Sequence, residues 1–276
     1  MKKMISLLTV LALTFTISMG TTFAEKTTYT ETELDTILTK AEVPQTILEG
    51  MDYDLKNFIV TNSGEDLKFA DSTTQEYFRD QKTNSLVSSD QMKTLDNIPT
   101  SDLSLTLLHF VINYNGTNMD DVYNSFEWKK NPSISPDGIY KDNIAIAVPD
   151  GWEVQSGKYA CATQTYDYTI ANGWQWTSPD SSTCNNGQPV QYHMYGAAWE
   201  FNSTKVAVPG FKFKGTSKLT MKKKNSTAIN RVVGAYNEAK SNIFGSYSVT
   251  IAFGPASVSF SPNSGSNSYQ QIDLTW

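Results

Sequence analysis

The feature that most limits the possible folds is a series of short, strand-like segments between residues 99 and 276. Apolar and polar residues alternate along them, and turn signals such as Asn172-Gly173 and Asn186-Gly187 separate them. The segment Leu103–Ile112 becomes apolar on both faces, which is typical of a central strand. Regularly spaced strands with such turns indicate an antiparallel β-sandwich or barrel, and we expect the sandwich. The other expected strands are Val122–Trp128, Ile144–Val148, Glu153–Gln164, Tyr166–Trp176, Gln191–Phe201, Val206–Lys214, Lys218–Met221, Tyr247–Phe253, Ser257–Phe260 and Gln270–Trp276.

The residues before this region carry helical signals instead. Thr30 and Glu33 form a capping box at the start of one expected helix. Pro44 suits the start of a second, whose apolar stripe reaches Phe58. A third, weaker helical segment is expected over Ser72–Asp80. The fold class is therefore mainly β, with a short N-terminal helical region.

The first residues are typical of a secretory signal peptide. Two lysines precede an apolar stretch, and small residues precede a cleavage position after Ala24. We expect residues 1–24 to be removed and the rest to be secreted. The secreted chain would then comprise a helical region, residues 25–98, and a β-sandwich-like domain, residues 99–276. Segment 225–244 suits either a helix or a strand.

Two cysteines, Cys161 and Cys184, agree with an extracellular location. An even number of cysteines in an oxidising compartment predicts one disulfide. Such a bond closes a loop of roughly 24 residues and would stabilise the fold by about 3 kcal/mol. It would also remove both thiols as candidate nucleophiles or metal ligands.

The composition excludes several classes of protein. Charged residues are 18% and aromatic residues 12% of the chain, with a net charge of −6. These values do not fit a multispan membrane protein, a collagen-like fibre or a highly charged disordered polymer. Without the first 24 residues, 20 basic residues face 28 acidic ones, which gives −8. Nucleic acid is therefore not expected as a partner of this exported, acidic protein.

Three stretches resemble a known group of proteins. They read AEVPQTILEGMDYDLKNFIV, VYNSFEWKKNPSIS and GSYSVTIAFGPASVSFSP. They are similar to stretches of exported β-rich proteins of Gram-positive spore-forming bacteria, in which a short helical leader precedes a β-rich region. The resemblance implies this organisation and location, and it implies no activity.

Catalytic and metal-binding motifs give no site. His109 shares an apolar strand face and is expected in the core, whereas His193 suits a surface or a site equally. The chain has no HExxH, GxSxG, P-loop or EF-hand pattern, so we expect no metal and no cofactor. A hydrolase using two carboxylates would need a cleft with two acids in close register. The available acids of the β region are Glu127, Asp137, Asp142, Asp150, Glu153, Asp167 and Glu200, and the sequence favours no pair.

Four aromatic residues form the first candidate contact surface. Tyr166 and Tyr168 share one strand face, and so do Trp174 and Trp176, with a hairpin turn at Asn172-Gly173 between the pairs. Exposed rings on a rigid hairpin suit a sugar ring or a lipid surface. The alternative is that one or both pairs fill the sandwich core.

A basic stretch forms the second candidate. It contains Lys212, Lys214, Lys218 and Lys222, and we expect a hairpin turn at Gly215-Thr216-Ser217 with the lysines pointing outward. Such a face could meet an anionic cell-wall polymer or anionic lipid headgroups. The alternative is a solvated face that protects an edge strand from aggregation.

Three functions remain open from these patterns. The leading hypothesis is an exported non-enzymatic protein that binds at the cell surface or in its surroundings, with carbohydrate, an anionic cell-wall polymer or a membrane surface as partner. A second is a membrane-active, toxin-like β protein, because Ser246–Phe253 and Ala256–Phe260 could form an amphipathic membrane hairpin. A third is a secreted carboxylate-dependent hydrolase.

Overall fold

Antiparallel β-strands make up most of the described chain. The computed structural model describes residues 28–79, 86–88, 101–130, 138–205, 210–239, 248–252, 256–261 and 267–276. The expected signal peptide falls on residues that lie outside the described ones. The expectation of a mainly β, sandwich-like fold with a short N-terminal helical region is confirmed.

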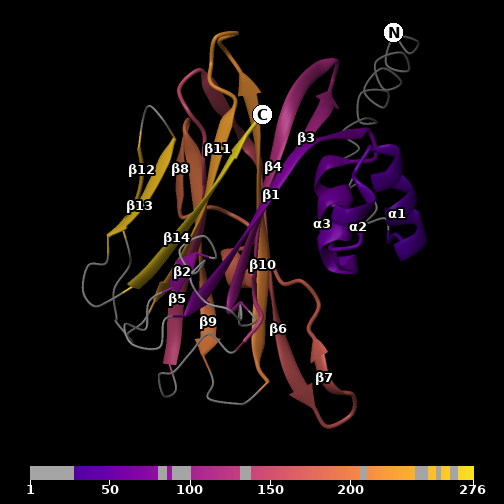
Figure 1. Cartoon of the computed structure of the whole chain (residues 1–276), viewed down its shortest axis with the longest axis vertical. Helices are drawn as coiled ribbons and strands as arrows, with labels where there is room; N and C mark the ends of the chain where they lie inside the picture. Colours follow the sequence, from indigo (N-terminus) through magenta and orange to yellow (C-terminus); the bar gives the residue numbers. More distant parts are fainter. Residues whose placement is uncertain are drawn as a thin grey trace, which may run out of the picture. The chain divides into compact units, whose positions relative to one another are not determined.

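Seven strands of the described chain form the larger sheet, in the order β2-β1-β3-β4-β10-β6-β7 (Figure 1). Strand β10 comes late in the sequence and yet lies between β4 and β6, with which it pairs antiparallel. This sheet therefore requires pairing between distant parts of the chain. The strands are β1 Leu67–Arg79, β2 Leu86–Ser88, β3 Leu103–Tyr114, β4 Thr117–Trp128, β6 Trp152–Thr169, β7 Gly173–Trp176 and β10 Lys212–Lys223.

A second sheet has the order β14-β11-β5-β9-β8 among the described residues. Its strands are also antiparallel, and β5 lies at its centre between β11 and β9. A separate hairpin of two strands, β12 and β13, completes the described β structure. The bounds are β5 Gly138–Ala147, β8 Gln191–His193, β9 Gly196–Lys205, β11 Arg231–Ala239, β12 Ser248–Ala252, β13 Ser257–Ser261 and β14 Asn267–Thr275.

The core lies between the two sheets. Phe126 of β4 stacks on Phe201 of β9, with ring centroids 5.3 Å apart, and also contacts Tyr236 of β11. Trp128 Nε1 donates to the Tyr236 hydroxyl at 2.9 Å, and that hydroxyl donates to Asp142 Oδ2 at 2.7 Å. This buried chain of hydrogen bonds satisfies the polar atoms of large side chains that otherwise pack as apolar groups. Burial raises the pKa of the Tyr236 hydroxyl well above its usual value.

Three helices precede the first strand. They are α1 Glu31–Lys40, α2 Gln45–Leu48 and α3 Tyr53–Ser63. Helix α1 begins directly after Thr30, as the capping box predicts. The second expected helix is divided, because Asp52 accepts a hydrogen bond from the Leu55 amide at 2.9 Å and so caps a new helix, α3.

Helix α3 packs on the face of the larger sheet that points away from the core. Phe58 makes an edge contact with the ring of Tyr123 on β4, at 6.1 Å between centroids. The Tyr123 hydroxyl donates to the Ile59 carbonyl at 3.1 Å. Lys218 Nζ of β10 donates to the Asn62 carbonyl at 2.9 Å. The short helices are therefore stabilised by the sheet, which isolated helices of this length need.

The expected helix over Ser72–Asp80 is wrong. Residues 72–79 belong to β1, which pairs with β3 from Leu67↔Ile112 to Tyr77↔Leu103. Most side chains of this segment are polar, so its sequence does not show the alternation of apolar and polar residues that is typical of a strand. Ser72, Thr74 and Glu76 face away from the core, and the partner strand supplies most of the apolar surface. Pairing with a strong neighbouring strand outweighs a weak local preference.

The expected hairpin at Gly215-Thr216-Ser217 is also wrong. Strand β10 runs through these residues without a turn and pairs on both sides, with β4 and β6. Gly215 lies against the core ring of Phe126, and a Cβ at this position would come within 2.7 Å of that ring. The glycine therefore makes room for an aromatic side chain and does not mark a turn.

The remaining ambiguous segments are strands. Residues 231–239 form β11, so the strand alternative for segment 225–244 holds there. The two segments expected as Glu153–Gln164 and Tyr166–Trp176 form the continuous strand β6 and the short strand β7. They are joined at the predicted Asn172-Gly173 turn, where Gly173 has φ +69°.

Replacing Gly215 by Ala tests this account of β10. We expect the free energy of unfolding to fall by about 1–3 kcal/mol, because the added methyl group would overlap the Phe126 ring in a packed core. Urea unfolding measures the change. Gly50→Ala is the matched control, because its new methyl group would meet neighbours no closer than 3.4 Å. Equal stability of the Gly215→Ala protein and the wild type would contradict the role given to this glycine.

Candidate functional site

Four aromatic side chains lie together on the hairpin of β6 and β7. We call Tyr166, Tyr168, Trp174 and Trp176 the aromatic hairpin. Tyr166 pairs with Trp176 and Tyr168 with Trp174 across the two strands, so all four point to one face. The Tyr166 ring is stacked near Trp174 at 5.7 Å and lies 5.3 Å from Trp176, and Tyr168 meets Trp174 edge-on at 5.8 Å. The expected pairing of these rings on one face is therefore present.

The rings are neither fully buried nor free of the core. Tyr168 is 58% exposed, while Tyr166, Trp174 and Trp176 are half-buried. Trp174 packs against the edge of the main core and against Gly210, where an added Cβ would lie 3.1 Å from the indole. The core proper is filled by other tryptophans, Trp128 and Trp199 among them. Part of each ring thus remains accessible, while packing against the core edge and Gly210 holds Trp174 in place.

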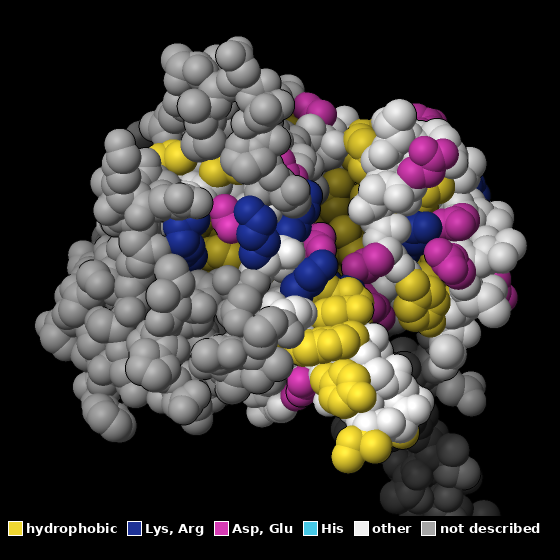
Figure 2. All heavy atoms as spheres, turned by 60° about the horizontal axis from the view of Figure 1, so that its bottom comes forward, with side chains coloured by type: hydrophobic (Ala, Val, Ile, Leu, Met, Phe, Trp, Pro, Cys, Tyr) yellow, Lys and Arg dark blue, Asp and Glu magenta, His cyan; other side chains and the backbone are white. Residues whose placement is uncertain are grey.

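Two lysines lie beside these rings. Lys214 Nζ is 4.4 Å from the centroid of the Trp176 ring, and Lys212 Nζ is 5.7 Å from that of Tyr166. Both distances allow a cation–π attraction. Figure 2 shows the face that carries the hairpin, with hydrophobic side chains in a row beside gathered Lys, Arg, Asp and Glu side chains.

The four candidate lysines do not form one exposed surface. They share one face of the straight strand β10, and this face meets the helices. Lys214 is 8% exposed and Lys218 is 5% exposed, so the expectation that both point outward is wrong. Lys222, by contrast, is exposed. The hairpin geometry on which the outward orientation depended is absent, because Gly215 continues the strand.

The two buried lysines form internal ion pairs. Lys214 Nζ lies 2.5 Å from Asp52 Oδ2 and 3.4 Å from Asp54 Oδ2, at the start of α3. Lys218 Nζ lies 3.0 Å from Asp121 Oδ2 on β4. Burial lowers the pKa of the Lys218 ammonium, and the nearby Asp121 carboxylate opposes this change. The Lys214 contacts attach α3 to the sheet, whereas the Lys218–Asp121 pair joins two strands of the sheet.

A groove of about 280 Å³ lies between α3 and the larger sheet. Its floor crosses five strands, because Glu76, Ser104, Glu127, Lys214 and Gln164 are paired directly from β1 to β6. We call these five residues the charged row. Its wall includes Asp52, Asp54 and Phe58. The groove is continuous with the aromatic hairpin, because Lys214 belongs to its floor and also contacts Trp176.

A second row of the floor consists of hydroxyl groups. Thr74, Thr106, Ser125 and Thr216 are paired across β1, β3, β4 and β10, and we call them the hydroxyl row. Thr74 and Thr106 hydroxyls lie 3.0 Å apart, and the Thr216 hydroxyl donates to Ser125 at 3.1 Å. Neither row is predicted from the sequence, because Thr74 and Glu76 lie in the segment that is expected to be helical. The available signal was the repeated spacing of polar residues by two, as in Thr74-x-Glu76 and Ser125-x-Glu127.

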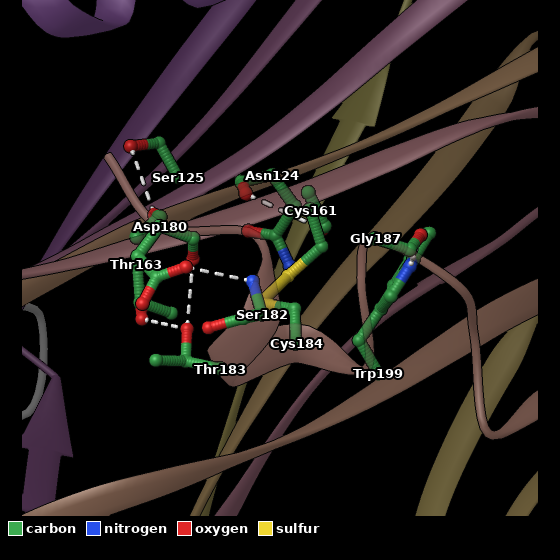
Figure 3. The surroundings of a disulfide bond; sticks show 12 residues. Asn124, Ser125, Cys161, Thr163, Asp180, Ser182, Thr183, Cys184, Gly187 and Trp199 are labelled. Carbon is green, nitrogen blue, oxygen red and sulfur yellow. Dashed lines mark hydrogen bonds between the residues drawn. A yellow bond between two sulfur atoms is a disulfide. The ribbon is translucent and has the colours of Figure 1, made fainter. Parts of the chain in front are cut away.

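The predicted disulfide is present between Cys161 of β6 and Cys184 of the short 3-10 helix Ser182–Cys184 (Figure 3). Thr163 and Asp180 exchange backbone hydrogen bonds beside it, at 2.9 and 3.1 Å. The Thr183 hydroxyl donates to the Asp180 carbonyl at 2.8 Å. The chain that leaves β7 is therefore fastened back onto β6. Both ends of the aromatic hairpin are held by this arrangement.

The other candidate residues have structural roles. His109 is fully buried and its Nε2 lies 2.6 Å from Asp120 Oδ1, which confirms a core histidine. His193 is exposed on β8. Asp142 is buried beneath Tyr236, and Asp150 accepts a hydrogen bond from the Gly151 amide in its turn. No group of three or more His, Cys, Asp and Glu side chains within the described ranges could hold a metal ion.

Among the described helices, none is both long enough and apolar enough to cross a membrane.

Comparisons with known proteins give little. No family model and no curated protein matches the chain. A solved structure described as a pore forming protein has a TM-score of 0.31 and 9% identity, covering 72% of this chain and 94% of that one. The collagen-binding domain from a Staphylococcus aureus adhesin has a TM-score of 0.26 and 5% identity, covering 56% of this chain and 87% of that one. AvmM, which catalyses macrocyclization in alchivemycin A biosynthesis, has a TM-score of 0.25 and 9% identity, covering 60% and 95%. With these TM-scores, the three likenesses carry no argument about function.

Replacing both Cys161 and Cys184 by Ser tests the role of the disulfide. We expect the free energy of unfolding to fall by about 3 kcal/mol, because the open chain regains the entropy of a closed loop. Urea unfolding of the oxidised proteins measures it. Ser181→Ala, an exposed position next to the same turn, is the control and should change little. A double variant as stable as the wild type would show that the disulfide does not stabilise this region.

Proposed function

We propose that the protein is an exported, non-enzymatic protein that binds saccharide at a cell surface or in its surroundings through the aromatic hairpin. The observation that carries this proposal is the set of four partly exposed rings that share one face of a two-stranded hairpin. Flat rings stack on the apolar faces of sugars, and polar groups beside them hydrogen-bond to the hydroxyls. The disulfide and the N-terminal sequence support export.

The surroundings of the rings favour a saccharide over a lipid. Lys212, Lys214 and Gln164 lie on the same face as the rings, and the hairpin continues into a polar groove. Insertion into a bilayer would remove water from these groups, whereas a polyhydroxylated ligand offers them hydrogen bonds. Rigid support also favours binding, because rings that are already ordered lose less conformational entropy when the ligand binds.

Replacing Tyr168 by Ala tests the proposal at the most exposed ring. We expect a tenfold or greater loss of affinity for saccharide, equivalent to about 1.4 kcal/mol, with unchanged thermal stability. Titration of fluorescently labelled hexasaccharides of a β-glucan, a chitin and an α-glucan measures the affinity. Tyr114→Ala is the control, because Tyr114 is also exposed, at 45%, and lies in the turn region between β3 and β4. Absence of binding to every hexasaccharide by the wild type would reject the proposal. Equal loss in both variants would reject the hairpin as the site.

A second candidate is a membrane-active protein that uses the β12–β13 hairpin. The two strands form a sheet of their own, and Ser257, Ser259 and Ser261 alternate with Val258 and Phe260. The hairpin packs through Val258 and Ala256 on a face of the second sheet that consists of small side chains. These are Ala145, Ala147, Ala198, Val233 and Ala235. Small side chains bury little apolar area, so separation of this hairpin from the sheet would cost comparatively little.

Dye release from vesicles tests this second candidate. If it holds, micromolar protein is expected to release dye from phosphatidylcholine–phosphatidylglycerol vesicles, and Val258→Asn to abolish release by placing an amide on the apolar face. Ser259→Ala, on the exposed face, should retain release. Intact vesicles at micromolar wild-type protein would remove this candidate.

A further inference from the structure

We propose that the groove beside the aromatic hairpin binds the continuation of a neutral saccharide chain whose first rings stack on the hairpin. This inference rests on the proposed function and adds a second binding site to it. It assigns Glu127 and the hydroxyl row to ligand binding.

Continuity between the two sites is the first argument. Lys214 Nζ lies 4.4 Å from the Trp176 ring and, at the same time, 2.5 Å from Asp52 in the groove wall. Gln164 Nε2 donates to Asp54 Oδ2 at 2.9 Å and to the Thr177 carbonyl directly after β7. These residues form a short, well-ordered path from the rings to the groove. A chain molecule that leaves the rings along this face therefore meets the groove next.

The chemistry of the floor is the second argument. The charged row and the hydroxyl row are neighbours on the same sheet face, two residues apart along each strand. Successive strands lie about 4.8 Å apart, so each row presents polar groups at regular intervals across the sheet. Hydroxyls both donate and accept hydrogen bonds, which matches the hydroxyls of a saccharide. A lipid tail would offer these hydroxyls no further hydrogen bonds.

Glu127 is the third argument. The other charged groups of the groove are paired: Glu76 with Lys129 at 3.0 Å, and Asp52 and Asp54 with Lys214. Within the described part of the chain, Glu127 makes no such contact, although it stands in the middle of the charged row and lines the groove. A carboxylate can accept hydrogen bonds from two adjacent hydroxyl groups. Its position therefore suits a ligand rather than a structural ion pair.

The charge of the groove selects the class of saccharide. Two lysines, Lys129 and Lys214, face four acids, Asp52, Asp54, Glu76 and Glu127, which gives a formal charge of −2. An anionic polymer would be repelled, so the ligand is neutral. Glu76 accepts hydrogen bonds from Lys129 and from Ser101. Its oxygens are therefore occupied by neighbouring side chains, whereas a hydrolase with two acids needs both carboxyl groups directed at the scissile bond. The geometry favours binding over hydrolysis.

The volume agrees with this assignment. At about 280 Å³, the groove lies just below the usual range of ligand pockets, about 300–1,000 Å³. The groove would hold a short stretch of the saccharide, and the aromatic hairpin would bind the sugar rings that precede this stretch. Affinity should therefore rise with chain length.

Two substitutions in the groove test the inference, Glu127→Gln and Thr106→Val. Both retain the shape of the side chain, and neither residue contacts the aromatic hairpin. Labelled disaccharides and hexasaccharides of the neutral glycan that binds best to the wild type are the probes. We expect each variant to lose tenfold or more in affinity for the hexasaccharide and to bind the disaccharide as the wild type does. Thr117→Val, at the start of β4 and outside the groove, is the matched control, and thermal unfolding checks that the variants fold.

The outcomes separate the two proposals. If no saccharide binds to the wild type, the proposed function fails and the groove assignment with it. If the hexasaccharide binds, if Tyr168→Ala removes that binding, and if Glu127→Gln and Thr106→Val leave it unchanged, the groove assignment alone is overturned. Tighter binding of a polygalacturonate hexasaccharide than of the neutral ones would also overturn it, as would release of shorter sugars from the probe.

Discussion

Strand β10 has apolar side chains on its core face and lysines on the opposite face, and much of the structure depends on this arrangement. Phe213, Leu219 and Met221 point into the core between the sheets, while Lys214 and Lys218 point to the helices. Side chains of a strand alternate strictly between its two faces, so a shift of one residue would place the lysines in the core. The register that fills the core therefore also positions the ion pairs that hold α3.

The buried ion pairs explain why the helices sit over this sheet face. Burying a charge is costly unless a partner compensates it, and replacing such a pair by apolar groups is often neutral or stabilising. The contacts of Lys214 with Asp52 and of Lys218 with the Asn62 carbonyl are therefore better regarded as determinants of helix position than of stability. They leave a polar groove open beside α3, because the short helices cover only part of the sheet. The groove is a consequence of this incomplete coverage.

The aromatic hairpin gains its rigidity from three supports. Trp174 packs against the core edge, Lys214 lies over Trp176, and the disulfide fastens the chain after β7 back onto β6. Together they hold rings that remain partly accessible. Such rings combine apolar area with an already ordered geometry, which is the property that makes aromatic residues effective contact residues at binding surfaces.

Local patterns were sufficient for the features that depend on neighbouring residues. The apolar alternation predicted most strands, Asn172-Gly173 predicted its hairpin turn, Thr30 the start of α1, and Cys161 with Cys184 the disulfide. The sequence by itself thus determined the fold class and the shared strand face within each aromatic pair, and the register of β6 and β7 places both pairs on the same face. Tertiary structure alone decided that β1 is a strand, that Gly215 faces Phe126, and that Lys214 and Lys218 are buried. The reason is physical: each of these depends on a partner at least 26 residues away, in pairing or packing that no local pattern of side chains contains.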